Sequence, residues 1–212
     1  EAAIEAIRAG KTRYTPVNGT VELKKAIAAK FLRDHAMKIN PDDVIIGTGG
    51  KQVLFNALVA TLGEGDEVLI PAPCWVSYPD MAILAGGKVV TVACGAETNF
   101  KITPAQLQQA ITPRTRWLIL NSPSNPTGSV YTEQELRALG EVLKGHPNVL
   151  VMVDDMYEKL LFDGTTFCTL AQAAPAIADR ILTVNGVSKA YCMTGWRIGY
   201  GHGPSWLIEA MS

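Results

Sequence analysis

The chain has 212 residues and a formal net charge of −1 without a basic run, which argues against binding to nucleic acid or to an anionic membrane surface. Hydrophobic residues make up 48% and charged residues 18%, an ordinary balance for a globular protein, and no apolar stretch approaches the roughly 20 residues that span a bilayer. The four cysteines are widely spaced and form no CxxC pair, so we expect free thiols, a cytoplasmic location and no metal site.

Both ends of the sequence have the pattern of helices. The chain opens on EAAIEAIRAG and stops on WLIEAMS, each inside a helical alternation of apolar and polar residues. We therefore expect residues 1–212 to form one domain of a protein that is cut at both ends.

Helical and extended segments alternate between these ends. A helix is predicted over residues 20–35 from the helical spacing of Leu23, Ala26, Ile27 and Phe31. Capping boxes predict two more helices that begin after Thr103 and Thr132. Six short apolar runs lie between the helices: VIIG (44–47), EVLI (67–70), KVVTV (88–92), WLIL (117–120), VLVMV (149–153) and ILTV (181–184). Because these runs are continuous, they indicate strands buried on both faces of a mostly parallel sheet, in a three-layer α/β/α domain.

Polar residues and glycines follow four of the apolar runs. The segments are TGGK (48–51), NSPSNPTG (121–128), DDMY (154–157) and NGVSK (185–189). The carboxyl ends of parallel strands meet at one edge of a sheet, where open α/β folds bind ligands. The sequence therefore predicts a site at this edge that contains a glycine-rich helix start, an Asn, an Asp, a Tyr, a Lys and an Arg.

Three familiar chemistries do not fit this set. A dinucleotide site needs GxGxxG after the first strand, which TGGKQ (48–52) does not supply. A P-loop needs Ser or Thr after its lysine, and Lys51 is followed by Gln52. The segment 186–190 loosely matches a serine nucleophile elbow, but only His202 follows it and no Asp or Glu lies between.

A lysine that forms a Schiff base with pyridoxal phosphate gives each of these groups a role. Amides at Gly50 and Lys51, together with Arg197, can bind the phosphate. Asp154 can keep the pyridine nitrogen protonated, and Lys189 can form the covalent bond and later carry a proton. The remaining groups can contact the ring: Trp75 by stacking, Asn125 and Tyr157 through its phenolic oxygen.

Six motifs in order carry a resemblance to a known family. They are YTPVNG (14–19), TGGKQ (48–52), PCWVSYP (73–79), NSPSNPTG (121–128), DDMYEKL (154–160) and SKAYCMTGWRIGY (188–200). With them the chain resembles the large domain of fold-type I pyridoxal-phosphate aminotransferases, in the aspartate aminotransferase branch. The resemblance covers essentially all 212 residues and implies that the N-terminal arm and the C-terminal small domain lie outside them.

For each residue named above, the resemblance implies the same role as the chemistry does. It also implies roles for two further residues, Tyr14 and Ser188. Tyr14 matches a tyrosine that reaches the phosphate of the neighbouring subunit, which implies a homodimer with shared active sites. Gly186 stands where many relatives have a phosphate-binding serine, and Ser188 is the candidate to replace it. Of the two acids, Asp154 is expected to pair with the ring nitrogen, and Asp155 stands where relatives often have Glu.

The implied activity is amino-group transfer between an acidic amino acid, aspartate or glutamate, and a 2-oxo acid. Lys51 matches a lysine that binds the distal carboxylate in one bacterial subgroup, and Trp75 and Asn125 are the other expected substrate contacts. Two alternatives stay open: a prephenate or aromatic aminotransferase, and a non-catalytic sensor domain of a transcription regulator, which fold alone does not exclude.

Overall fold

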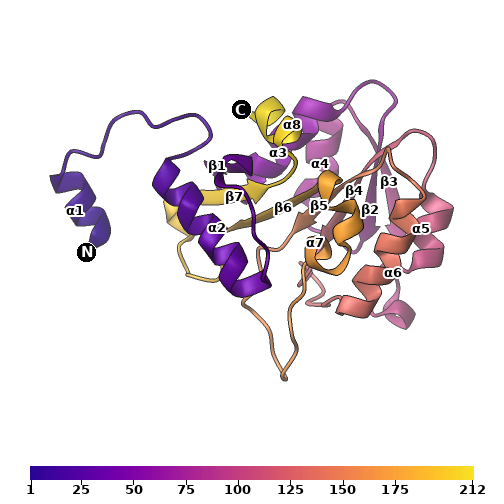
Figure 1. Ribbon diagram of the computed structural model, residues 1–212. Helices are drawn as coiled ribbons and strands as arrows, with labels where there is room; N and C mark the ends of the chain where they lie inside the picture. The colour runs from indigo at the N-terminus through magenta and orange to yellow at the C-terminus, as the bar shows by residue number, and fades with distance from the viewer.

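The computed structural model describes residues 1–212 and builds them around a seven-stranded sheet (Figure 1). The strands lie in the order β1-β7-β6-β5-β4-β2-β3. Their bounds are β1 Val44–Thr48, β2 Glu67–Ala72, β3 Lys88–Ala93, β4 Thr115–Asn121, β5 Leu150–Asp154, β6 Ile181–Gly186 and β7 Ile198–His202. Only β7 runs antiparallel to its neighbours, β1 and β6. The mostly parallel sheet expected from the sequence is therefore confirmed.

Helices cover both faces of this sheet (Figure 1). They are α1 Ala2–Arg8, α2 Val21–His35, α3 Gly50–Thr61, α4 Ser77–Leu84, α5 Pro104–Ala110, α6 Glu133–Lys144, α7 Leu170–Ala173 and α8 Ser205–Met211. Short 3₁₀ turns are η1 Pro41–Asp43, η2 Ala96–Thr98, η3 Pro175–Arg180 and η4 Thr194–Trp196. Helices α3, α4 and α8 pack on one face, and α5, α6 and α7 on the other, with α2 over the β1–β7 end. The α/β/α layering is thus also confirmed, while α1 stands apart and buries no residue.

The core consists of two apolar layers separated by the central strands. On β4, Leu118 and Leu120 face α5, α6 and α7, whereas Trp117 and Ile119 face α3, α4 and α8. This alternation follows from the period of two in a strand, and it explains why the central runs are apolar at every position. The indole of Trp117 also donates a 2.8 Å hydrogen bond to Thr61 Oγ1 at the end of α3.

Three expectations need correction. The run at β3 is not buried on both faces, because β3 is an edge strand and none of its six residues is fully buried. The sheet has a seventh strand, β7, that the apolar runs did not predict, because Gly199 and Gly201 alternate with larger residues along it. A Cβ at Gly199 would collide with the backbone of Gly49 and Gly50, so glycine is needed there for close approach to the start of α3. On α2, Ala26 is exposed, and a charged residue, Lys30, is buried instead.

Two other sequence inferences can be compared with the structure. No helix combines the length and the apolar character needed to cross a membrane. All four cysteines are free thiols, as their spacing indicated: Cys74, Cys94, Cys168 and Cys192.

Both expected capping boxes are present. The Thr132 hydroxyl accepts from the backbone N–H of Glu135 at 3.2 Å, and the Glu135 carboxylate accepts from the N–H of Thr132 at 2.8 Å. The same pair of bonds joins Thr103 and Gln106 at the start of α5. Each box satisfies two amide donors that a helix start leaves without partners.

We predict that Thr132→Ala lowers the free energy of unfolding by about 1 kcal/mol, because it removes the acceptor of the Glu135 amide at the start of α6. Urea denaturation of the purified protein measures the change. Thr132→Ser retains the hydroxyl and is the control, expected to match the wild type. Equal stability of the Ala and Ser variants would contradict a role for the cap.

Candidate functional site

A pocket of about 300 Å³ lies at the carboxyl ends of the central parallel strands. Asn121 ends β4, Asp154 ends β5, and the chain after β6 carries Ser188 and Lys189. Strand register pairs Asn121 with Asp154 and Asp154 with Val184, so these ends are neighbours in the sheet. The glycine turn after β1 leads into α3 on the same wall. The pocket is therefore at the edge that the sequence predicted.

Asp154 is the buried acid of this pocket, with 6% of its surface exposed. The hydroxyl of Tyr78 donates to its Oδ2 at 2.7 Å, and the N–H of Met156 donates to its Oδ1 at 3.2 Å. Burial raises the pKa of Asp154 above its ordinary value, and these two donors only partly offset that effect. Because no cation of the chain pairs with it, this carboxylate is suited to a positively charged ligand group.

The neighbouring acid has a different environment. Asp155 is 1% exposed, does not line the pocket, and has no hydrogen-bond partner for either carboxyl oxygen. Burial raises the pKa of Asp155 well above its ordinary value, so the fold favours the neutral acid. Of the two acids, only Asp154 is presented to a ligand.

Asn121 connects two walls of the pocket. Its Nδ2 donates to the backbone oxygen of Asp154 at 2.7 Å, and its Oδ1 accepts from the N–H of Asn125 at 2.7 Å. Burial and the nearby Asp154 raise the pKa of the Tyr157 phenol, and the neighbouring Asn125 side chain partly offsets them. Asn125 and Tyr157 thus form one polar wall beside Asp154.

The opposite end of the pocket is suited to an anion. Gly49 has φ +89° and precedes α3, whose first residues, Gly50 and Lys51, line the pocket. A helix start leaves amide donors without partners, which favours an anion there. The guanidinium of Arg197 donates to two carbonyl oxygens, those of Thr194 at 2.9 Å and Thr48 at 3.5 Å, and pairs with no carboxylate. A Cβ at Gly49 would collide with this guanidinium, so glycine permits their contact.

Ser188 contributes a hydroxyl to the same pocket and is 8% exposed. The preceding Gly186 could not carry a serine without movement, because a Cβ there would lie 2.8 Å from the carbonyl oxygen of Ile198 and 3.1 Å from Met156 Cε. The close pairing of β6 with β7 therefore explains the glycine, and the replacement of the serine by Ser188 stays a prediction.

Lys51 and Trp75 form the rim. The ammonium of Lys51 lies 4.7 Å from the centre of the Trp75 ring, a cation–π distance. Trp75 in turn meets Tyr78 edge-on, with ring centres 5.4 Å apart. Tyr78 links this rim to the buried Asp154 through its hydroxyl.

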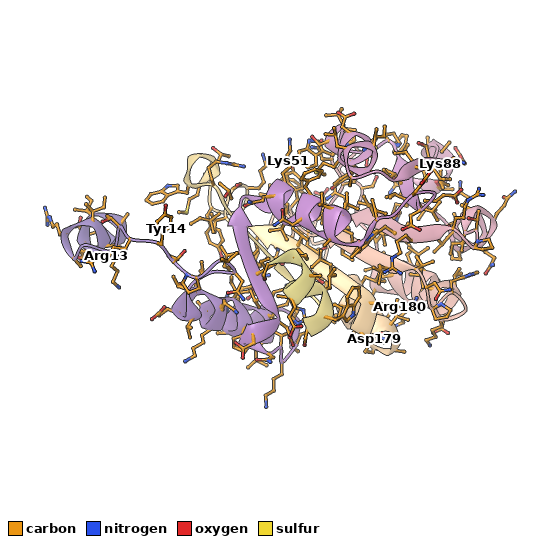
Figure 2. All side chains as sticks on the ribbon, turned by 90° about the horizontal axis from the view of Figure 1, so that it is seen from above. Arg13, Tyr14, Lys51, Lys88, Asp179 and Arg180 are labelled. Atoms are coloured by element: carbon orange, nitrogen blue, oxygen red, sulfur yellow. The ribbon has the colours of Figure 1, made fainter.

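The structure brings together every expected site residue except Tyr14. The residues that line the pocket are Gly50, Lys51, Trp75, Asn125, Asp154, Tyr157, Ser188, Lys189 and Arg197. Tyr14 lies fully exposed on the segment between α1 and α2, away from Lys51 (Figure 2). Its expected partner is on a second subunit, so its role stays a prediction.

Sequence reasoning did not single out five residues that line the pocket: Leu54, Tyr78, Asn121, Met156 and Thr194. Of these, Tyr78 and Asn121 contribute polar side chains that hydrogen-bond Asp154. Both stand inside motifs quoted for other residues. Tyr78 is three positions after Trp75 at the start of a helix, and Asn121 is the last residue of β4. The signal for Asn121 was its place at a strand end, the same signal that singled out Asp154.

Comparison with known proteins agrees with this geometry. A family model described as aminotransferase class I and II matches residues 1–212. The chain is 64% identical over 210 residues to the aspartate/prephenate aminotransferase of Cereibacter sphaeroides (strain ATCC 17029 / ATH 2.4.9), covering 99% of this chain and 52% of that protein. It is 53% identical over 212 residues to the aspartate aminotransferase of Rhizobium meliloti (strain 1021), covering 100% of this chain and 52% of that protein.

Solved structures give the same result. The crystal structure of the aspartate aminotransferase from Rhizobium meliloti matches with a TM-score of 0.98 and 54% identity, over 99% of this chain and 52% of that one. The aromatic aminotransferase from Pyrococcus horikoshii OT3 matches with a TM-score of 0.94 and 39% identity, over 99% of this chain and 56% of that one. The chain spans about half the length of the curated relatives it matches. By its sequence and its fold, the chain belongs to the aminotransferase class I and II family.

Proposed function

We propose that this chain binds pyridoxal phosphate and serves amino-group transfer between an acidic amino acid and a 2-oxo acid. The observation that carries the proposal is one pocket that holds Lys189, the buried Asp154 and the anion-suited end formed by Gly50, Ser188 and Arg197. Two relatives named aspartate/prephenate and aspartate aminotransferase support the reaction class.

The residues of the pocket fit this cofactor group by group. Asp154 is a buried carboxylate without a cation of its own, and a protonated pyridine nitrogen would supply one. Arg197 has guanidinium donors without a carboxylate partner, as a phosphate would require. When bound, pyridoxal phosphate supplies an aldehyde that condenses with amines and a protonated ring that withdraws electrons.

The protein's own groups would hold and orient the cofactor and move protons. Asp154 accepts from Tyr78. Its carboxylate would pair with the protonated ring nitrogen of the cofactor. Tyr157 and Asn125 offer donors to the phenolic oxygen of the ring, and Trp75 offers a flat apolar face. Lys189 is exposed on the pocket wall, and its Nζ would bind the cofactor covalently and carry a proton during transfer.

Lys51 is the residue that we propose binds the substrate's distal carboxylate. Its ammonium is exposed at the pocket rim beside Trp75, and the only contact the chain gives it there is the cation–π contact. A carboxylate that enters the pocket would gain a charge-assisted partner. The name of one relative favours prephenate, which also has a second carboxylate, as a second substrate.

We also propose a homodimer with shared active sites. Tyr14 is fully exposed, and α1 buries none of its residues while it exposes Ile4 and Ile7. An apolar helix face without a covering element within the chain favours contact with a second copy. The cytoplasmic location inferred from the cysteines stays a prediction.

Covalent trapping tests the assignment of the lysine. Borohydride reduction of the protein with pyridoxal phosphate should attach the pyridoxyl group to Lys189, because this amine shares the pocket with Asp154 and Arg197. Peptide mass mapping locates the modification, and Lys189→Ala should abolish it. A pyridoxyl group on Lys51, or on no lysine, would overturn the proposal.

The two adjacent acids provide a matched pair of variants. Asp154→Asn should retain the cofactor and lose most of the transamination activity, because a neutral amide cannot hold the proton on the ring nitrogen. Asp155→Asn should remain active, because the fold already favours the neutral form of Asp155. Initial rates with aspartate and 2-oxoglutarate measure both, and the reverse result would assign the role to Asp155.

Asp155→Asn also has a predicted effect on stability. The pKa of Asp155 is raised in the folded state, so above the unfolded-state pKa of about 4 the wild type loses stability as pH rises. An asparagine at this position cannot ionise, so Asp155→Asn should have a higher free energy of unfolding than the wild type at pH 7. This difference in free energy should vanish near pH 4.

Lys51→Ala tests whether the Lys51 ammonium binds the distal carboxylate of the substrate. Truncating one partner of a desolvated ion pair costs about 2–5 kcal/mol, so kcat/KM for aspartate should fall by about thirtyfold or more. A donor with an apolar side chain should lose much less, because it makes no such contact. Equal losses for both donors would mean that the Lys51 side chain does not select the second carboxylate. A protein that binds the cofactor and amino acids without turnover would instead support the sensor-domain alternative.

A further inference from the structure

Three ionisable side chains are buried together behind the turn that follows β5. The Nζ of Lys30 lies 2.6 Å from both carboxylate oxygens of Glu158, and Nε2 of His35 lies 2.9 Å from Glu158 Oε2. Lys30 is 9% exposed, and His35 and Glu158 are 5% exposed each. None of the three lines the pocket. We refer to them as the Lys30–His35–Glu158 cluster.

Glu158 is the negative member of the cluster. Burial acts to raise the pKa of Glu158, but the hydrogen bond from His35 and the charge of Lys30 outweigh burial and lower it. The adjacent Asp155 makes no hydrogen bond to these cations. Burial is the largest cause that raises the pKa of Asp155, the negative charge of Glu158 adds to it, and the charge of Lys30 acts against it. The cluster is thus a charged cross-link between α2 and the turn, in a place where water does not screen it.

The cross-link is attached directly beside Tyr157. The turn begins with a hydrogen bond from the Asp155 N–H to Val184 O at 2.8 Å. It continues with bonds from the Glu158 N–H to Asp155 O at 3.0 Å and from the Leu160 N–H to Tyr157 O at 2.8 Å. From Leu160 onward the chain is largely exposed, up to residue 166. Glu158 therefore holds the turn between a fixed strand end and an exposed loop.

A second ion pair reinforces the same attachment. Lys159 Nζ lies 2.9 Å from Asp34 Oδ2, and Asp34 is on α2 between the two cluster residues Lys30 and His35. Two successive residues of the turn, Glu158 and Lys159, are thus bound to one helix. Because Lys159 is half exposed, its pair is screened by solvent and contributes less than the buried one.

We propose that Glu158 is a positioning residue: its buried attachment to Lys30 and His35 fixes the turn so that the Tyr157 phenol is presented to the ligand in the pocket. The inference rests on the proposed function, in which Tyr157 donates to the phenolic oxygen of the cofactor. Glu158 touches neither the pocket nor a ligand and acts only through its neighbour.

A double-mutant cycle in the full chain with pyridoxal phosphate bound tests this role. A phenol that donates a hydrogen bond to the cofactor's oxygen stabilises the deprotonated form of the cofactor. Tyr157→Phe should therefore raise the pH midpoint of the absorbance change of the bound cofactor. Glu158→Gln should move it in the same direction and should weaken cofactor binding about tenfold, the order expected for one lost hydrogen bond. Adding Glu158→Gln to Tyr157→Phe should then have no further effect on either quantity.

The cycle separates positioning from a general loss of stability. Glu158→Gln lowers the melting temperature under either explanation, but only positioning makes its effects on the cofactor vanish in the Tyr157→Phe background. Glu158→Asp, which retains the charge, should partly restore the wild-type pH midpoint. Glu141→Gln removes a member of the exposed Lys144 ion pair and is the control expected to change nothing. Additive effects of the two substitutions, or an unchanged midpoint in Glu158→Gln, would overturn the proposal.

Hydrogen exchange without cofactor distinguishes failure of this inference from failure of the proposed function. Glu158→Gln should speed exchange of the Leu160 amide, which is bonded to Tyr157 O, by about tenfold, while amides within β5 exchange as in the wild type. Should Glu158→Gln not fold, His35→Gln removes one contact of the cluster and should give a smaller change in the same direction. Unchanged exchange overturns the positioning role. A wild type that binds no pyridoxal phosphate overturns the proposed function.

Discussion

The buried carboxylate of Asp154 is the constraint around which the pocket is arranged. An ionised acid that is 6% exposed and lacks a cation destabilises the fold unless donors or a ligand charge compensate it. The chain supplies only partial compensation, through Tyr78 and the amide of Met156. Residues from α4 and from the turn after β5 therefore converge on this one group, and the carboxylate remains without a cation from the chain.

Close backbone packing determines the other end of the pocket. Strand β7 passes directly under the turn at Gly49 and Gly50, an approach that only the glycine at 199 allows. The same strand begins next to Arg197, so the packing that brings β7 under α3 also delivers the guanidinium to the helix start. The position of Arg197 at this end thus depends on backbone contact more than on any side-chain pair.

The sequence predicted the layers and the six apolar strands, because strands buried on both faces are apolar at successive positions. It predicted most of the pocket, because the polar residues of the site directly follow the carboxyl ends of these strands. It did not predict β7, whose glycines serve a contact with a segment about 150 residues away, a requirement that no local pattern reveals. Lys30 was also missed as a buried residue, because its partner Glu158 is 128 positions away. The role of Tyr78 depends in the same way on a distant partner, Asp154, which only the folded chain brings near.

The connection between β6 and β7 has a consequence for how this region can vary in length. Pairing of Gly186 with Gly199 fixes both ends of the connection, and Val187 N–H bonds Ile198 O at 3.1 Å just inside it. Lys189 stands near one end and Arg197 near the other, so a single loop sets the separation between the amine and the guanidinium. An insertion or deletion between these two residues would alter that separation, and with it the length of any ligand that both groups could contact at once.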